Sequence, residues 1–293
     1  MGRQKLRTAI QIVWTALSNG YVMGFAKGKL YGGSLKNICV PGLNCYSCPG
    51  ALGACPLGAL QATLADRNFR FAFYAVGFLM LFGTILGRVV CGFLCPFGLV
   101  QDLLYKLPLP KKWKKRKLLP GDRFLKWFKY ILLILFCLLL PMVIVDVAGQ
   151  GKPWFCAYVC PSGTFLGGIP MVAANAGLRT ALGWLWRWKL ALLISIVVLS
   201  VFYYRPFCRY LCPLGAIYGC FNSVSLLRYR LNEEACIHCG KCQKVCPFEL
   251  DPSKTPNHAE CIRCGRCLDA CPTDALHGLI RKQKNACPYG RRP

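Results

Sequence analysis

Four long apolar stretches alternate with more polar segments along this chain. They cover residues 8–25, 69–90, 124–147 and 184–204. Each is close to the roughly 20 residues that cross the hydrocarbon of a bilayer as a helix, so the pattern predicts four membrane-spanning helices. The first stretch is the least apolar, and a signal peptide is its alternative because basic residues precede it. A small-x-small cleavage motif does not follow, which favours an uncleaved helix.

The overall composition supports a chain that is partly in lipid. Of the 293 residues, 55% are hydrophobic and only 16% are charged, and the mean hydropathy is +0.39. A soluble domain has about 25% charged residues. The 37 basic and 11 acidic residues give a formal charge of +26, concentrated near the predicted span ends, so we interpret it as topology and lipid contact. Since no base-reading motif is visible, nucleic acid is not an expected partner.

The basic residues are distributed unevenly between the loops. The largest run, Lys-Lys-Trp-Lys-Lys-Arg-Lys at residues 111–117, lies between the second and third predicted spans. The positive-inside rule places that loop in the cytoplasm. With four spans, the N-terminus and the segment after the last span are then cytoplasmic as well. The loops at 26–68 and 148–183 lie outside.

Two cysteine runs near the C-terminus share the spacing C-x2-C-x2-C-x3-C-P. That spacing is typical of bacterial two-cluster ferredoxins, in which the fourth cysteine of each run binds the other cluster. It assigns two [4Fe–4S] clusters, one to Cys236, Cys239, Cys242 and Cys271, and the other to Cys246, Cys261, Cys264 and Cys267. A zinc site or a disulfide knot is the alternative, but zinc ligands come in pairs and not in runs of four.

A second cysteine motif occurs four times. We call its members the Cys-Pro elbows, and they begin at Cys55, Cys95, Cys160 and Cys212. Three of them have another cysteine four residues earlier, namely Cys91, Cys156 and Cys208. The first has Ala51 there, and the turn Cys45-Tyr-Ser-Cys48 is the expected substitute. Because span and elbow alternate twice in the same order, we predict an internal duplication with a unit of about 120 residues.

The elbow sequence has a physical rationale. Proline is favoured at the first turn of a helix, where its missing N–H is not needed. The preceding cysteine is then the N-cap, close to free N–H groups and to the positive end of the helix. We expect this environment to lower the pKa of the thiol and to suit an anionic cluster.

The predicted topology sorts the elbow cysteines into two sets. The inner set, on the cytoplasmic side, consists of Cys91, Cys95, Cys208 and Cys212. The outer set consists of Cys45, Cys48, Cys55, Cys156 and Cys160. We expect an iron–sulfur cluster at each set, of two or four irons. The alternative for the inner set is the packing of small buried residues, and for the outer set it is a disulfide in an oxidising exterior.

The predicted fold is therefore mainly α-helical, with one small mixed module. Residues 1–228 are expected to form a four-span domain with internal duplication and re-entrant or interfacial elbow helices. Residues 229–280 are expected to form an α+β ferredoxin module, and residues 281–293 a basic tail.

These motifs resemble the membrane polyferredoxins of the NapH type and the C-terminal membrane half of NosR-type regulators. The resemblance covers most of residues 69–275 and implies a multi-pass electron-transfer protein of a prokaryotic cytoplasmic membrane, often with a quinol-oxidising role. The chain departs from that pattern in its outer set. The motifs that carry the resemblance are Cys91-x3-Cys95-Pro, Cys208-x3-Cys212-Pro and the two-cluster segment from Cys236 to Cys271.

Cysteine sets on both sides of the membrane favour one function over the others. The chain is expected to carry electrons between a cytoplasmic donor and an extracytoplasmic flavoprotein or cytochrome. The enzymatic alternative is a quinol dehydrogenase, in which quinone binds near the inner set and Asp102 or Asp146 accepts a proton. A redox sensor or assembly factor would need a docking domain, and only 22 residues follow Cys271.

Overall fold

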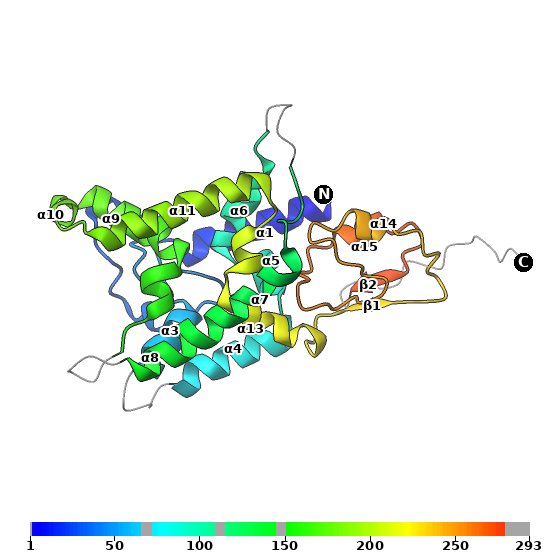
Figure 1. Cartoon of the computed structure of the whole chain (residues 1–293), viewed down its shortest axis with the longest axis horizontal. Coiled ribbons are helices and arrows are strands. Elements are labelled where there is room, and N and C mark those ends of the chain that lie inside the picture. The colour runs from blue at the N-terminus through cyan, green and yellow to red at the C-terminus, as the bar shows by residue number, and fades with distance from the viewer. Residues whose placement is uncertain (1, 66–71, 109–114, 145–150, 279–293) are drawn as a thin grey trace, which may run out of the picture.

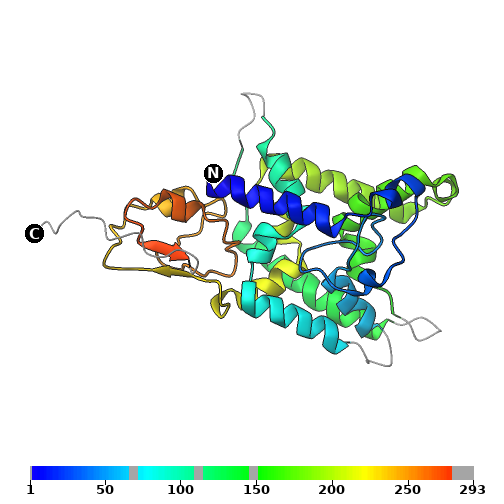
Figure 2. The ribbon, with the colours of Figure 1, turned by 180° about the vertical axis from the view of Figure 1, so that it is seen from behind.

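The computed structural model describes residues 2–65, 72–108, 115–144 and 151–278. It consists of an elongated helical body with a smaller cysteine-rich module at one end (Figure 1). The N-terminus of the first helix lies beside that module, as the view from behind also shows (Figure 2). Most of the basic run at 111–117, Asp146 and the basic tail at 281–293 lie outside the described residues.

The first half of the body contains two helices that begin at Cys-Pro elbows. Its elements are α1 (Arg3–Ser18), α2 (Val22–Lys27), the 3-10 helix η1 (Ser34–Asn37), α3 (Pro56–Leu64), α4 (Ala72–Leu86), α5 (Val89–Phe93) and α6 (Pro96–Lys106). As expected from the elbow sequence, proline is the first residue of α3 and α6, and Cys55 and Cys95 are their N-caps.

The second half follows the same order of apolar helix and elbow. Its elements are α7 (Asp122–Leu132), η2 (Leu133–Leu139), α8 (Leu140–Val143), η3 (Phe155–Val159), η4 (Gly163–Gly168), α9 (Ile169–Ala174), α10 (Ala176–Thr180), α11 (Trp184–Phe202), α12 (Pro206–Tyr210), α13 (Pro213–Cys220) and η5 (Phe221–Ser223). Cys212 is the N-cap of α13. The third elbow differs, because after Cys160 the chain continues as the π-helix η4.

The two halves interlock through their second elbows. Helix α6 packs against α1 of its own half and α11 of the other half, and α13 packs against α7 of its own half and α4 of the other. The two elbows therefore meet inside the body, on the side that faces the module. Their cysteines belong to the buried core of the body, where the rings of Phe97 and Phe207 meet edge to face at 5.2 Å.

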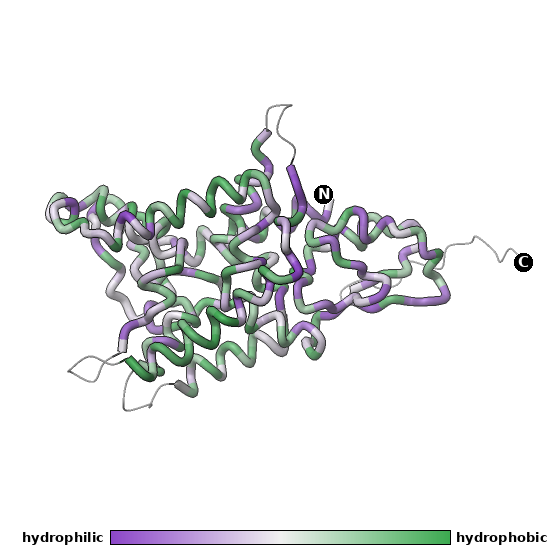
Figure 3. Tube along the Cα trace, viewed as in Figure 1, coloured by the Kyte–Doolittle hydropathy of each residue, from purple (hydrophilic) through white to green (hydrophobic). Residues whose placement is uncertain are grey.

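Two helices of the described chain are long and apolar enough to cross a bilayer, Asp122–Val143 and Trp184–Phe202. Figure 3 shows apolar residues along both of them and along the shorter α4. The first predicted span differs from the structure, because α1 ends at Ser18 and α2 is a separate short helix. By length and composition, therefore, two of the four predicted spans are matched.

The C-terminal module is held together by one pair of strands and two short helices. Its elements are β1 (Tyr229–Leu231), α14 (Lys241–Lys244), α15 (Arg266–Ala270) and β2 (Leu276–Gly278). The strands pair antiparallel, with Tyr229 opposite Gly278 and Leu231 opposite Leu276. This pairing joins the beginning of the module to its end, so that the cysteine loops lie between them.

Candidate iron–sulfur sites

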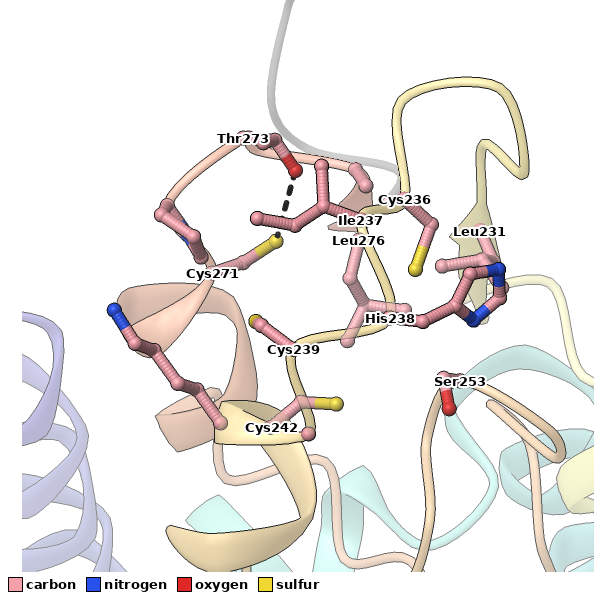
Figure 4. Close-up of a pocket in the computed structure, with 14 residues that line it drawn as sticks. Leu231, Cys236, Ile237, His238, Cys239, Cys242, Ser253, Cys271, Thr273 and Leu276 are labelled. Carbon is pink, nitrogen blue, oxygen red and sulfur yellow. Dashed lines mark hydrogen bonds between the residues drawn. The ribbon is translucent and has the colours of Figure 1, made fainter.

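The module gathers eight cysteines around two pockets, and each pocket takes one cysteine from the other run. The first pocket, drawn in Figure 4, is lined by Cys236, Cys239, Cys242 and Cys271. The second is lined by Cys246, Cys261, Cys264 and Cys267. These are the two groups that the spacing predicts. Gly240 and Gly265 are the N-caps of α14 and α15 with φ of +68° and +82°, a region that favours glycine and lets each loop turn sharply.

Hydrogen-bond donors of the protein surround the sulfur of Cys271. Its Sγ lies 3.8 Å from Thr273 Oγ1 (Figure 4). Burial alone would raise the pKa of Cys271, but hydrogen bonds from the Leu276 backbone and from Thr273 outweigh it and lower that pKa. The surroundings of this sulfur therefore stabilise a thiolate, the form that binds iron.

The structure brings together the four cysteines of the inner set inside the body. Cys91 and Cys208 lie in the short helices α5 and α12, and Cys95 and Cys212 are the N-caps of α6 and α13. All four are buried, and their thiols lie within electrostatic range of one another. Gln101 Nε2 donates a hydrogen bond to Cys208 Sγ at 3.1 Å. Two elbows from separate halves thus supply a four-thiol site.

Two arginines that motif reasoning missed support the inner set. Arg88 stands three residues before Cys91, and Arg205 stands three residues before Cys208. Both arginines are completely buried. Each crosses to the opposite elbow. Arg88 donates to the Cys208 carbonyl at 3.3 Å, and Arg205 donates to the Cys91 carbonyl at 2.6 Å. Two buried cations beside four thiols suit an anionic cluster, whose own charge belongs in the local balance.

Each of these arginines is paired with a buried carboxylate. Arg205 binds Asp102 on α6 through hydrogen bonds of 2.7 and 2.5 Å, and Arg88 binds Glu260 of the module at 2.9 Å. Asp102 stands seven residues after its elbow cysteine, Cys95, and the residue at that position in the fourth elbow, after Cys212, is Gly219. The module therefore supplies the carboxylate that the fourth elbow lacks.

A second cation completes each of these groups. Arg7 of α1 binds Asp102 at 2.9 Å, and Lys129 of α7 binds Glu260. Burial alone would raise the pKa of Asp102, but Arg205 and Arg7 outweigh it and lower that pKa. Asp102 is therefore an ionised partner of two arginines, which argues against the expected role as a proton acceptor for quinol. The other candidate, Asp146, lies outside the described residues.

The module packs directly against the inner set. A Cβ added to Gly92, the residue after Cys91, would lie 2.4 Å from the Ile262 carbonyl oxygen, so only glycine permits this approach. Gln4 of α1 donates to the carbonyl of Cys264 at 2.8 Å. The second cysteine group of the module is thus adjacent to the inner set.

Four cysteines of the outer set line a cavity of about 650 Å³, on the side of the body away from the module. They are Cys45, Cys55, Cys156 and Cys160, and Cys39 lines the same cavity. A Cβ at Gly163 in the third elbow would lie 3.5 Å from Cys45 Sγ, so the Cys45 sulfur lies beside the third elbow. Cys48 is buried outside the cavity, with its Sγ 3.6 Å from Asn19 Oδ1.

A short backbone segment joins the inner and outer sets. The backbone N–H of Leu43 lies near the sulfur of Cys95, where it opposes the rise in pKa that burial causes in this thiol, and Leu43 also lines the outer cavity. A Cβ at Gly42 would lie 2.5 Å from the Leu94 carbonyl oxygen. Buried Tyr218 of α13 donates to the Pro41 carbonyl at 3.0 Å. The segment at 41–45 therefore runs from one cysteine set to the other.

The expectation that the elbows lower the thiol pKa is wrong for the buried cysteines. Burial raises the pKa of Cys160 to about 11 and that of Cys55 to about 12, although backbone N–H donors near each sulfur act in the opposite direction. The loss of hydration on burial outweighs the donors at the start of a short helix. These thiols are neutral at pH 7 until a metal displaces the proton, as coordination to a cation does.

The spacing of these groups suits a cluster better than a single metal ion. Among the described residues, no three Cys, His, Asp or Glu side chains are close enough to hold one ion. The ligands of an iron–sulfur cluster bind different irons and stand farther apart. The 20 described cysteines are all free thiols, and the groups of four fit the ligand requirement of such a cluster.

Comparison with protein families identifies the class. A 4Fe-4S binding domain model matches residues 53–74, 71–116, 130–171 and 184–231, which together make up more than half of the chain. A 4Fe-4S dicluster domain model matches residues 228–272. Each of the four matches in the body includes one Cys-Pro elbow. The chain therefore belongs to the 4Fe-4S binding ferredoxin-type family whose members include NapH, MauN and NosR, and the predicted resemblance is confirmed.

Individual relatives show the same family relationship. The uncharacterized protein MJ0750 of Methanocaldococcus jannaschii is 31% identical over 66% of this chain and 72% of its own length. The methylamine utilization ferredoxin-type protein MauN of Paracoccus denitrificans is 31% identical over 55% of this chain and 48% of its own. The ferredoxin-type protein NapH of Haemophilus influenzae is 28% identical over 68% and 61%, respectively.

The chain spans about half the length of several curated relatives, such as 54% of the uncharacterized protein MJ0749 of Methanocaldococcus jannaschii and 48% of MauN. No solved structure matches it.

Proposed function

We propose that this protein is an iron–sulfur integral membrane protein that carries electrons between a cytoplasmic donor and an extracytoplasmic acceptor. The ferredoxin module at 229–280 would hold two [4Fe–4S] clusters. The domain at 1–228 would hold one cluster at the inner set and one at Cys45, Cys55, Cys156 and Cys160. Bound clusters supply one-electron redox chemistry, and the residues of the chain hold them, exclude water and set their potentials.

Exposed apolar helices support the membrane location. In the most apolar windows of Asp122–Val143 and Trp184–Phe202, only 22% and 17% of the residues are buried. The core helix of a soluble protein would bury its apolar side chains. Here Phe124 and Ile194 are 83% and 54% exposed, as expected for side chains in contact with lipid. With α1 and α4 as the remaining spans, the halves would form a duplicated four-span domain with elbow helices at both membrane faces.

Contacts at the module end support the proposed orientation. Arg3 at the start of α1 forms an ion pair with Asp269 at 3.3 Å, and Lys117 of the basic loop donates to the Lys244 carbonyl at 2.6 Å. The start of α1, Lys117 and the module therefore share one side of the protein. Since the largest basic run of the sequence ends at Lys117, we assign that side to the cytoplasm.

One observation carries the proposal, namely the unbroken order of cysteine groups through the molecule. The first group of the module packs against the second at Cys242 and Cys267, the second adjoins the inner set at Gly92, and the inner set adjoins the outer set through the segment at 41–45. Electron tunnelling between centres requires short separations through protein. A series of neighbouring groups from the module to the far side of the body supports such transfer.

The surface near the first cysteine group suits a soluble, acidic partner. Cys239 is exposed, and the neighbouring helix α14 carries exposed Lys241 and Lys244. Complementary charge steers the encounter of redox proteins. We therefore propose that an acidic cytoplasmic redox protein exchanges electrons here, and that a flavoprotein or cytochrome does so at the outer face.

Iron analysis and electron transfer across vesicles test this function. Anaerobically purified protein should contain about 16 irons per chain, and the double variant Cys156→Ala/Cys160→Ala about 12, because each cubane contributes four. In proteoliposomes the variant should still accept electrons at the module but should not transfer them to an acceptor enclosed on the other side. Cys220→Ala, an exposed cysteine outside every group, is the matched control and should behave like the unmodified protein.

Two outcomes would contradict the proposal. Unchanged iron content and unchanged transfer in the double variant would remove the outer set from the path. Reduction of the inner centre by added quinol, retained in the double variant, would support the quinol dehydrogenase instead.

A further inference from the structure

The third Cys-Pro elbow is the one that carries hydroxyl side chains. In Cys160-Pro-Ser-Gly-Thr, Ser162 and Thr164 occupy the second and fourth positions after the cysteine. The other three elbows have apolar residues at both positions. At the second position these are Leu57, Phe97 and Leu214, and at the fourth they are Ala59, Leu99 and Ala216. The second-position residues are 0%, 2% and 2% exposed, so Ser162 stands where the other elbows have a core side chain.

Both hydroxyls are buried without a hydrogen-bond partner among the described residues. Ser162 is 1% exposed and Thr164 is 2% exposed, and neither oxygen has an acceptor. Serine and threonine within a helix usually bond the carbonyl one turn earlier. A buried hydroxyl without a partner costs about 1–3 kcal/mol, and such a group in a native protein indicates a missing partner.

The position of these residues identifies the partner. Ser162 and Thr164 line the cavity that also holds Cys45, Cys55 and Cys160. A hydroxyl hydrogen rotates freely toward an acceptor, and the acceptors that this cavity would contain are the thiolate and sulfide sulfurs of the bound cluster.

We propose that the hydroxyls of Ser162 and Thr164 donate hydrogen bonds to sulfur atoms of the cluster at the outer set and thereby raise its reduction potential. The inference rests on the cluster assigned to that set in the proposed function. Reduction adds one negative charge to the cluster, and a hydrogen-bond donor stabilises the more negative state. Hydroxyl donors in the third elbow thus favour electron flow toward the outer face.

A redox titration followed by EPR tests this assignment. Ser162→Ala and Thr164→Val should each lower the midpoint potential of the outer centre, with the module and inner centres unchanged. One hydrogen bond contributes about 1 kcal/mol, which is about a fivefold change in the reduction equilibrium, or about 40 mV for a one-electron couple. Ser162→Thr and Thr164→Ser keep the donors and should keep the potential.

Two hydroxyls outside the cavity, on buried Ser200 and half-buried Thr63, provide controls. Ser200 Oγ already donates to the Ile196 carbonyl at 2.7 Å, and Thr63 Oγ1 donates to the Leu60 carbonyl at 2.9 Å. Ser200→Ala and Thr63→Val should leave the potential of the outer centre unchanged. In the unmodified protein, couplings of exchangeable protons to the reduced outer centre should be seen by ENDOR and should weaken in each cavity variant.

The outcomes separate this inference from the proposed function. An outer centre with the same potential and the same proton couplings in Ser162→Ala and Thr164→Val would overturn the inference alone, and would assign the hydroxyls to cavity water. Iron content of about 12 per chain in the unmodified protein, with no outer centre, would overturn both.

Discussion

Replacing Glu260 by glutamine tests whether the ferredoxin module and the body form one unit. Glu260 is 3% exposed and accepts hydrogen bonds from Arg88 and Lys129. Burial alone would raise its pKa, but these two cations outweigh burial and lower it from the ordinary 4.5 to about 2. That difference corresponds to about 3 kcal/mol of stabilisation at neutral pH.

The glutamine keeps the shape of the side chain but leaves two buried cations without their shared anion. Removing one partner of a buried ion pair typically costs about 3–5 kcal/mol, in agreement with the value from the pKa. A loss of about 3 kcal/mol increases the population of the undocked module by about a hundredfold. Because the pKa of Glu260 is about 2, the stabilisation is complete above about pH 4.5 and is lost only as the pH falls toward 2.

Native-state proteolysis measures this population, because cleavage follows the equilibrium opening of the module when closing is fast. Cleavage after Arg263, which is 3% exposed and donates to the Leu86 and Asn222 carbonyls of the body, should accelerate about a hundredfold in Glu260→Gln. Glu249→Gln, an exposed carboxylate of the same module, is the control and should change little. Adding Lys129→Met to Glu260→Gln should recover part of the lost docking free energy, with a coupling of about 0.5–3 kcal/mol between the two positions. A change below about threefold in Glu260→Gln, or an equal change in Glu249→Gln, would refute the reasoning.

Two further substitutions test how the cysteine groups adjoin. Gly92→Ala places a Cβ 2.4 Å from the Ile262 carbonyl oxygen and should destabilise docking by about 1–3 kcal/mol, seen as slower reduction of the inner centre from the module. Gly77→Ala, which has open space around it, should have no such effect. Tyr218→Leu removes the hydrogen bond to the Pro41 carbonyl, at a cost of about 1–3 kcal/mol in stability. Electron transfer between the inner and outer centres should become slower, with the iron content unchanged. Equal transfer rates before and after the substitution would exclude this route.

Local backbone features were read correctly from the sequence, and the iron ligands stay a prediction. The spacing of each ferredoxin run brings three cysteines to one turn, and the expected groups of four surround the two pockets of the module. The Cys-Pro sequence predicts an N-cap cysteine and a first-turn proline, as found at Cys55, Cys95 and Cys212. These features depend on residues close together in the chain, so their geometry follows from backbone preferences. The membrane orientation and the identity of the redox partners stay predictions.

The surroundings of the sites were decided by the tertiary structure. Arg88 and Arg205 each donate to a carbonyl of the opposite elbow, which is possible only when the two halves pack together. Arg88 also pairs with Glu260, which takes the place of an acid at Gly219, and this requires the distant module to pack against the body. The same holds for Cys45, which faces the outer cavity while its neighbour Cys48 does not. Burial, which raises the pKa of the elbow thiols, has the same origin. The sequence by itself determined which atoms can bind iron, because ligand chemistry and turn geometry are local. Only the tertiary structure decided which charges and hydrogen-bond donors surround them, because those come from segments brought together by folding.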